Sequence, residues 1–140
     1  FIPSDNRSEK LIINTNCIVM DAYNANPTSM KKAINSIVQF SNKKKVMVLG
    51  DMNELGDLSA QEHQKIGKII SKLNVDTCYF IGKKMKHAHL VNKNSLWFDT
   101  KKELKEALLS IKIEDSDILI KGSRSLELEK LLPVIKKISA

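Results

Sequence analysis

The sequence predicts an α/β fold, a Rossmann-like three-layer sandwich with a mostly parallel sheet and an antiparallel strand at its N-terminal edge. Short apolar runs typical of strands alternate with longer segments whose apolar residues recur at helical spacing. After Met20 this alternation favours a parallel sheet wrapped by helices through right-handed crossovers. Only the first two runs depart from it, because the short link Thr15-Asn16 between them predicts a hairpin.

The apolar runs predict six strands. The third run, at 45–49, is continuously apolar after Lys45, as expected for a strand that is buried on both faces of a parallel sheet. Gly82 follows the fourth run and marks its end. The predicted strands cover residues 10–14, 17–20, 45–49, 77–81, 95–98 and 117–121.

Capping signals mark where the helices begin. Asn26-Pro27 predicts the first start, because Asn caps helices and Pro suits the first turn. Residues 59–62 and 100–103 have the Ser/Thr-x-x-Glu pattern of a capping box. The last helix is predicted to begin near Ser125, and Pro133 inside it should bend or interrupt it. Between the second helix and the fifth strand, residues 83–90 predict a short helix or an irregular piece.

Composition limits the class of protein. The chain has 140 residues, about the length of one domain, and its 42% hydrophobic content argues against disorder. No apolar run reaches the roughly 18 residues of a membrane span, and the N-terminus lacks both a signal-peptide pattern and an initiator Met. We therefore expect a piece of a longer cytoplasmic protein. Cys17 and Cys78 lie in strand-like runs and are interpreted as reduced core thiols.

The net charge is +7, which raises the possibility of nucleic-acid binding. The basic residues are mostly Lys at helical spacing without an aromatic stacking pattern, so a solvated Lys surface is the preferred interpretation and no nucleic-acid partner is expected. Of the 23 basic residues only Arg7 and Arg124 are arginines. Arginine offers a planar fork that grips a phosphate or carboxylate through two hydrogen bonds, which Lys cannot do.

Polar residues gather directly after three of the predicted strands, at 21–27, 50–56 and 121–124. Ligands of such sheets bind beyond the carboxyl ends of the strands, so we expect these loops to form one polar pocket. Asn26 is a helix cap in any case, whereas Asn24 lies too early to cap the same helix. Asp51 is left open between a plain loop residue and a ligand. His63 is interpreted as a helix-surface residue, and the three histidines show no metal-binding arrangement.

Arg124 precedes the predicted last helix, where a cation opposes the helix dipole unless an anion lies between them. The chain has no Gly-rich phosphate loop, no Ser-His-Asp set and no pair of carboxylates with evident acid and base roles. The sequence thus predicts a binding surface without catalytic residues of its own and without a metal site.

The three loops resemble the signature of the Mur ligase family, in the branch that adds D-alanyl-D-alanine. The matching residues are Asp21-Ala22-Tyr23-Asn24-Ala25-Asn26-Pro27, Leu49-Gly50-Asp51-Met52 with Glu54-Leu55-Gly56, and Lys121-Gly122-Ser123-Arg124 with Glu129. Ser29-Met30, Glu62-His63 and Gly67 add to the match, and Phe1, Pro3 and Arg7-Ser8 resemble the family's lead-in from the preceding domain. Met20 departs from the pattern, since many relatives have a second Asp there.

The resemblance implies a fragment of a three-domain, ATP-dependent ligase of peptidoglycan precursor synthesis. In that family the first domain holds the uridine nucleotide, and the central domain carries the phosphate loop, the magnesium ligands and usually a carbamylated lysine. The third domain, which this chain resembles, closes over ATP and presents D-alanyl-D-alanine to UDP-N-acetylmuramoyl-tripeptide through an acyl phosphate. The isolated fragment is expected to be inactive.

By motif position, the resemblance places Arg7 at the ATP phosphates, Asp21 at the ribose hydroxyls, and Asn24 and Asn26 between nucleotide and dipeptide. Ser123 and Arg124 are the candidates for the dipeptide carboxylate, with Asn24 and Asp51 also on the substrate side. Two alternatives stay open: a stand-alone nucleotide- or phosphate-binding regulatory module of Rossmann or receiver type, and a basic nucleic-acid-binding domain.

Overall fold

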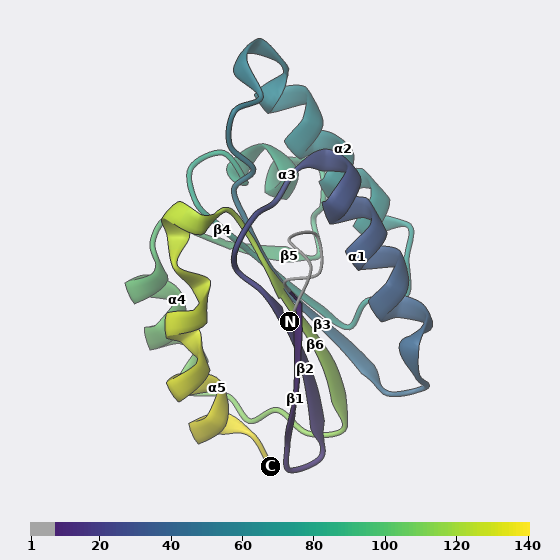
Figure 1. Ribbon diagram of the computed structural model, residues 1–140, viewed down its shortest axis with the longest axis vertical. Coiled ribbons are helices and arrows are strands. Elements are labelled where there is room, and N and C mark those ends of the chain that lie inside the picture. Colours follow the sequence, from purple (N-terminus) through teal and green to yellow (C-terminus); the bar gives the residue numbers. More distant parts are fainter. Residues whose placement is uncertain (1–7) are drawn as a thin grey trace, which may run out of the picture.

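The computed structural model describes residues 8–140, so the predicted contact of Arg7 with ATP lies outside the described residues. A six-stranded sheet in the order β1-β2-β6-β3-β4-β5 forms the centre of the fold (Figure 1). β1 pairs antiparallel with β2, and every other neighbouring pair is parallel. The predicted fold class is confirmed. The strands are β1 Glu9–Ile13, β2 Asn16–Asp21, β3 Lys44–Gly50, β4 Thr77–Ile81, β5 Ser95–Phe98 and β6 Ser116–Lys121.

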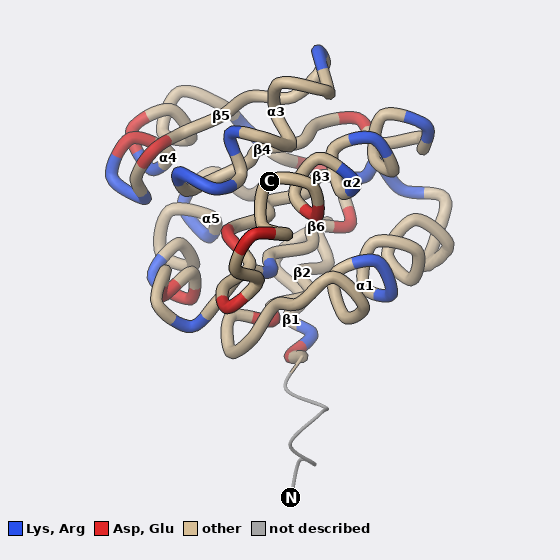
Figure 2. Tube along the Cα trace, turned by 90° about the horizontal axis from the view of Figure 1, so that it is seen from above, with Lys and Arg blue, Asp and Glu red and all other residues tan. Residues whose placement is uncertain are grey.

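Helices cover both faces of the sheet and give the three layers (Figures 1 and 2). One layer holds α1 Pro27–Phe40, α2 Ser59–Ser71 and α3 Lys86–Leu90, and the other holds α4 Lys101–Leu108 and α5 Leu132–Ile138. Three short 3₁₀ helices complete the fold: η1 Gly56–Leu58, η2 Arg124–Leu126 and η3 Leu128–Leu131. Within residues 8–140, no helix combines the length and the apolarity needed to cross a bilayer.

The core consists of two hydrophobic clusters, one on each face of the sheet. Successive side chains of a strand point to opposite faces, so Val46 and Val48 of β3 join the α4/α5 cluster while Met47 and Leu49 join the α1/α2 cluster. This explains why that stretch is apolar without interruption, as predicted. The free thiols of Cys17 and Cys78 are both buried, as expected for reduced core cysteines.

The hairpin turn lies one residue earlier than predicted. Asn14 and Thr15 form the turn, with Asn14 at a positive φ of 55°, and Ile13 pairs with Asn16. Asn16 is fully buried: its amide donates to Ile113 O at 3.0 Å and its Oδ1 accepts from Ser116 N at 3.0 Å. These two hydrogen bonds hold Asn16 inside β2 rather than in the turn.

The capping signals had mixed outcomes. Asn26 caps α1 as predicted, and Ser29 completes its capping box. Thr100 caps α4 by accepting from Glu103 N at 3.3 Å, and its hydroxyl also donates to the Glu103 side chain. The predicted box at Ser59 is wrong, because η1 leads directly into α2 and Leu58 takes the cap position without a side-chain hydrogen bond.

The predicted last helix does not begin near Ser125. Residues after β6 form η2 and η3 instead, separated by Glu127 in the left-handed conformation at φ 51°. The α-helix begins only at Leu132, so Pro133 occupies its first turn. Pro fits there without loss of a helical hydrogen bond, so it neither bends nor interrupts the helix.

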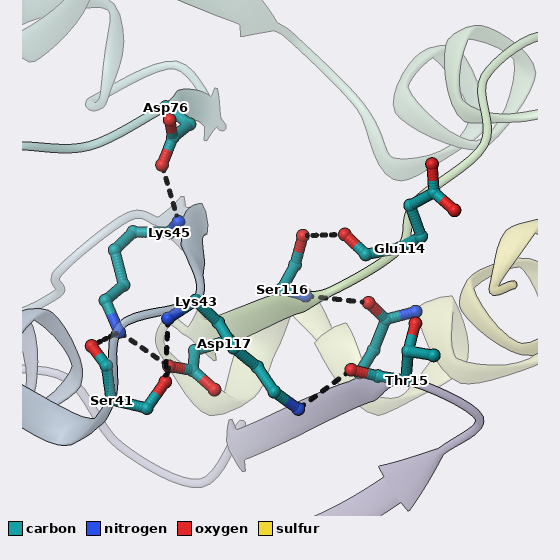
Figure 3. A network of polar contacts seen from close by, with 9 residues as sticks. Thr15, Ser41, Lys43, Lys45, Asp76, Glu114, Ser116 and Asp117 are labelled. Carbon is teal, nitrogen blue, oxygen red and sulfur yellow. Dashed lines mark hydrogen bonds and ion pairs between the residues drawn. The ribbon is translucent and has the colours of Figure 1, made fainter.

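A buried polar network ties the amino-terminal edge of the sheet together (Figure 3). Lys45 Nζ lies 2.5 Å from Asp117 Oδ2 and donates to Ser41 O at 2.9 Å. Ser41 Oγ donates to the same carboxylate oxygen at 2.5 Å. Both charged side chains are almost completely enclosed. Breaking such a pair would leave an uncompensated buried charge, which is strongly destabilising. The network therefore holds β3 and β6 in register and fastens the end of α1 to them.

Close packing of α2 on α3 depends on Gly67. A Cβ atom added there would collide with the backbone oxygen of Ala88 and lie 2.9 Å from its Cα. We therefore predict that Gly67→Ala lowers the free energy of unfolding by about 1–3 kcal/mol, the usual cost of overpacking.

Helix propensity alone predicts the opposite sign, a gain of about 1 kcal/mol for Gly→Ala inside a helix. Denaturant unfolding of Gly67→Ala therefore separates the two expectations, because they differ in the sign of the change in the free energy of unfolding. The matched control is Lys68→Ala, an exposed change one residue along α2. A Gly67→Ala protein at least as stable as wild type would contradict the packing assigned here.

Candidate functional site

The three polar loops meet at the carboxyl-terminal edge of the sheet, as predicted. β6 lies between β2 and β3, and its extension bonds to both neighbouring loops. Gly122 N donates to Asp21 O at 3.3 Å, and Ser123 N donates to Asp51 O at 3.0 Å. Three segments far apart in the sequence thus form one continuous surface.

An ion pair between a buried lysine and a partly exposed aspartate lies at the centre of this edge. Lys121 Nζ is 2.5 Å from Asp21 Oδ2 and donates to Asn24 O at 3.0 Å. Ser8 Oγ lies 3.5 Å from the same Asp21 oxygen. The Lys121 side chain is only 2% exposed. Sequence reasoning included Lys121 in a motif but gave it no role, although a lone cation ending the apolar run at 118–120 could have drawn attention to it.

Asp21 and Lys121 line the end of a groove of about 420 Å³ that runs between the sheet and α1. Its floor is apolar and comes from β2 and β6, while its walls carry hydroxyl and ammonium groups. The lining residues include Ser8, Lys10, Val19, Ser29, Lys32 and Leu119. The groove can therefore receive a ligand with both apolar and hydrogen-bonding parts.

The two asparagines of the first loop are engaged with their own backbone. Asn26 Oδ1 accepts from Ser29 N at 2.8 Å, the capping role that was expected of it. Asn24 Oδ1 accepts from Ala25 N at 2.9 Å, and its carbonyl receives Lys121. Both side chains are exposed at the mouth of the site.

Asp51 holds the neighbouring loop in place. Its Oδ1 accepts from Met85 N at 2.9 Å, and the carboxylate packs against Gly82, where any added Cβ would collide with it. Gly82 has a φ of 110°, a conformation that favours glycine. Partial burial raises the pKa of Asp51 above its ordinary value. The observed contacts of Asp51 are those of a structural loop residue.

His63 is fully buried, so its interpretation as a helix-surface residue was wrong. Its Nε2 accepts from Met52 N at 3.0 Å, so Nδ1 carries the proton and donates to Ser59 O at 2.7 Å. Burial lowers the pKa of the His63 imidazole, which keeps it neutral. His63 therefore clamps the loop after β3. The burial of His63 could have been predicted from the sequence, because His63 lies on the same face of the helix as the apolar residues Ile66 and Ile70.

The third loop carries Ser123 and Arg124. Ser123 is buried, with its hydroxyl 3.1 Å from Ser125 Oγ, whereas the Arg124 side chain is 58% exposed. Arg124 Nη1 forms an ion pair with Glu129 Oε2 at 2.5 Å, which is a structural role for this side chain. Arg124 itself begins the 3₁₀ helix η2 and does not precede an α-helix, so the predicted opposition between its charge and a helix dipole is wrong.

A further polar chain links the loops after β3, β4 and β6. Lys84 Nζ donates to Asn53 Oδ1 at 2.7 Å, and Asn53 Nδ2 donates to Ser125 Oγ at 3.0 Å. The loops of the site are thus linked both by backbone hydrogen bonds and by this chain of side-chain hydrogen bonds. Across residues 8–140 no three His, Cys, Asp or Glu side chains are placed to hold a metal ion.

Comparison with known proteins places this geometry in a family. The model of the glutamate ligase domain of Mur ligases matches residues 6–124. The UDP-N-acetylmuramoyl-tripeptide–D-alanyl-D-alanine ligase of Buchnera aphidicola (Acyrthosiphon pisum) is 35% identical over 129 residues, 90% of this chain and 28% of the relative. The ligase of the same name from Bacillus subtilis is 36% identical over 122 residues, 82% of this chain and 27% of the relative.

Solved structures agree. A crystal structure of MurF from Acinetobacter baumannii matches with a TM-score of 0.86 and 31% identity, covering 96% of this chain and 30% of that one. MurF from Thermotoga maritima, solved in complex with ADP, matches with a TM-score of 0.81 and 25% identity, covering 98% of this chain and 32% of that one. The chain therefore spans under a third of these relatives' length, and it belongs to the Mur ligase family as a C-terminal, glutamate ligase domain related to MurF.

Proposed function

We propose that this domain works within an ATP-dependent ligase that joins D-alanyl-D-alanine to UDP-N-acetylmuramoyl-tripeptide in cytoplasmic peptidoglycan precursor synthesis. The observation that carries the proposal is the convergence of three motif-bearing loops on one edge of the sheet, linked by backbone hydrogen bonds. The relatives named for this reaction match the chain over nearly its whole length, which supports the same assignment.

In this reaction ATP phosphorylates the terminal carboxylate of the tripeptide, and the amine of the dipeptide attacks the acyl phosphate and releases phosphate. The preceding domains would supply the phosphate loop and the magnesium ligands. The contribution of this chain is to bind and orient, which lowers the barrier by bringing reactants together in a fixed geometry. We assign none of its residues to bond making or breaking.

Asp21 is the proposed partner of the ATP ribose. A carboxylate accepts hydrogen bonds from two vicinal hydroxyls, and Asp21 lies at the carboxyl end of β2, where ligands of parallel sheets bind. Lys121 and Ser8 take its Oδ2, which leaves Oδ1 without a hydrogen-bond partner among residues 8–140. Asn24 and Asn26 follow at the mouth of the site, between this position and the third loop.

Ser123 and Arg124 are the proposed partners of the dipeptide carboxylate. Arg124 bonds Glu129 through one of its terminal nitrogens only, and its exposed side chain has further N–H groups to offer. Glu129 would then hold the Arg124 guanidinium in place, while the remaining N–H groups of the guanidinium bind the carboxylate of the dipeptide. Asp51 supports this loop through its carbonyl, which accepts from Ser123 N.

The first test concerns the domain itself. We predict that a protein comprising residues 8–140 unfolds cooperatively and releases no phosphate from ATP when supplied with tripeptide precursor and dipeptide. The reason is a complete pair of hydrophobic clusters without a phosphate loop. ATP-dependent phosphate release above a no-enzyme control would contradict this division of labour. An upstream reading frame without a phosphate loop would instead favour a stand-alone regulatory module.

Asp21→Ala in the full-length ligase should raise the KM for ATP, because a charge-assisted hydrogen bond worth about 1.5–3 kcal/mol is lost. The KM for the dipeptide should change less. Glu106→Ala, an exposed change of the same charge on α4, is the control. An unchanged KM for ATP together with a lower melting temperature would make Asp21 a purely structural residue.

Arg124→Lys should raise the KM for D-alanyl-D-alanine by about tenfold, or about 1.4 kcal/mol, because the charge stays while the fork is lost. The KM for ATP should respond less. Lys130→Arg, an exposed change on the same segment, controls for altered side-chain shape. If both constants of Arg124→Lys equal those of wild type at an unchanged melting temperature, Arg124 does not read the carboxylate.

A further inference from the structure

We propose that Lys121 is a positioning residue of the nucleotide site, where its ammonium group aims the Asp21 carboxylate at the ribose and fixes the backbone of the Asp21–Asn24 loop. This inference rests on the proposed function, because it gives Lys121 a role in ATP binding through Asp21. The juxtaposition that carries it is a buried cation that contacts both ends of the loop at the wall of the groove.

Burial of Lys121 calls for an explanation. The side chain is 2% exposed and ends a strand whose preceding residues, Ile118, Leu119 and Ile120, all belong to the core. Removing an ammonium group from water is costly, and well-packed apolar residues often replace a buried ion pair without loss of stability. Burial alone does not assign a role to Lys121, because Lys45 is buried in the same way; what distinguishes Lys121 is that its partner lines the groove.

The geometry divides the carboxylate of Asp21 between two tasks. Lys121 Nζ donates to Asp21 Oδ2 at 2.5 Å, so that this oxygen faces β6. Asp21 Oδ1 has no hydrogen-bond partner among residues 8–140. The Asp21 side chain is 16% exposed, so it remains accessible from the groove. A carboxylate placed in this way can accept hydrogen bonds from both hydroxyls of a ribose.

The same ammonium group fixes the loop that follows Asp21. Its second hydrogen bond goes to Asn24 O at 3.0 Å, while the next residue of its own chain, Gly122, donates from N to Asp21 O at 3.3 Å. Lys121 thus grips both ends of the segment from Asp21 to Asn24. Because Ser123 and Arg124 follow after Gly122, Lys121 joins the proposed nucleotide loop to the proposed dipeptide loop.

The chain contains a matched comparison for this pair. Lys45 Nζ and Asp117 Oδ2 are also 2.5 Å apart, and both side chains are buried (Figure 3). Asp117 lies near the start of β6 and Lys121 at its end, so the two pairs occupy opposite ends of the strands. The Asp117 side chain is 1% exposed, compared with 16% for Asp21, so the Lys45 pair is closed to ligands. Lys45→Met therefore removes a buried ion pair of the same chemistry without touching the site.

The test uses the full-length ligase with Lys121→Met, Lys121→Arg, Asp21→Asn and Lys45→Met. For each protein, the KM for ATP, kcat at saturating ATP and the melting temperature are measured. We expect Lys121→Met to raise the KM for ATP by about tenfold, as the loss of a charge-assisted bond predicts, with a smaller change in kcat. Lys45→Met should lower the melting temperature and leave the KM for ATP at the wild-type value.

A KM for ATP that Lys121→Met leaves unchanged, beside a melting temperature lowered as in Lys45→Met, would overturn the inference. If Lys121→Met does not fold, Lys121→Arg decides, because it keeps the charge but cannot reproduce the geometry of the two hydrogen bonds. In that case a raised KM for ATP in Lys121→Arg supports the positioning role of Lys121, and a wild-type KM for ATP refutes it. An unchanged KM in Asp21→Asn would instead refute the proposed nucleotide site itself, which keeps the two failures distinct.

Discussion

The parallel register of β2, β6 and β3 is the constraint on which the rest of the molecule depends. Asp21 pairs with Lys121 across β2 and β6, and Lys121 pairs with Leu49 across β6 and β3, so all three strands end at the same level. A shift by one residue would turn Lys121 to the opposite face of the sheet and separate it from Asp21. The sheet therefore brings together the loops that follow these strands, and hydrogen bonds between the loops then hold them in place.

Two buried lysine–aspartate pairs mark the two ends of this sheet and serve different purposes. The pair of Lys45 and Asp117 is enclosed and joins β3, β6 and α1. The pair of Lys121 and Asp21 opens onto a groove, and the Asp21 side chain is partly exposed. Similar chemistry thus stabilises one edge and, in the proposed function, positions a ligand-binding carboxylate at the other; the two pairs differ in how far the carboxylate is exposed.

Much of the fold could be predicted from the sequence, because apolar runs and helical periodicity report burial directly. All six strands and the convergence of the three loops followed from that pattern. The region after β6 could not be predicted, because Ser125 and Pro133 are equally compatible with one helix or with two 3₁₀ turns before a later helix. The buried positions of His63 and Lys121 were missed because polar residues were expected at the surface, whereas their burial depends on partners that only the tertiary structure supplies.

A crystal structure of the full-length ligase with a non-hydrolysable ATP analogue and D-alanyl-D-alanine tests the central claim most directly. The account predicts that the ribose hydroxyls donate to the Asp21 carboxylate while Lys121 stays bound to its other oxygen. It also predicts the dipeptide carboxylate at Ser123 and Arg124. A closed complex in which the nucleotide makes no contact with the loop after β2, or in which the dipeptide binds away from the loop after β6, would contradict it.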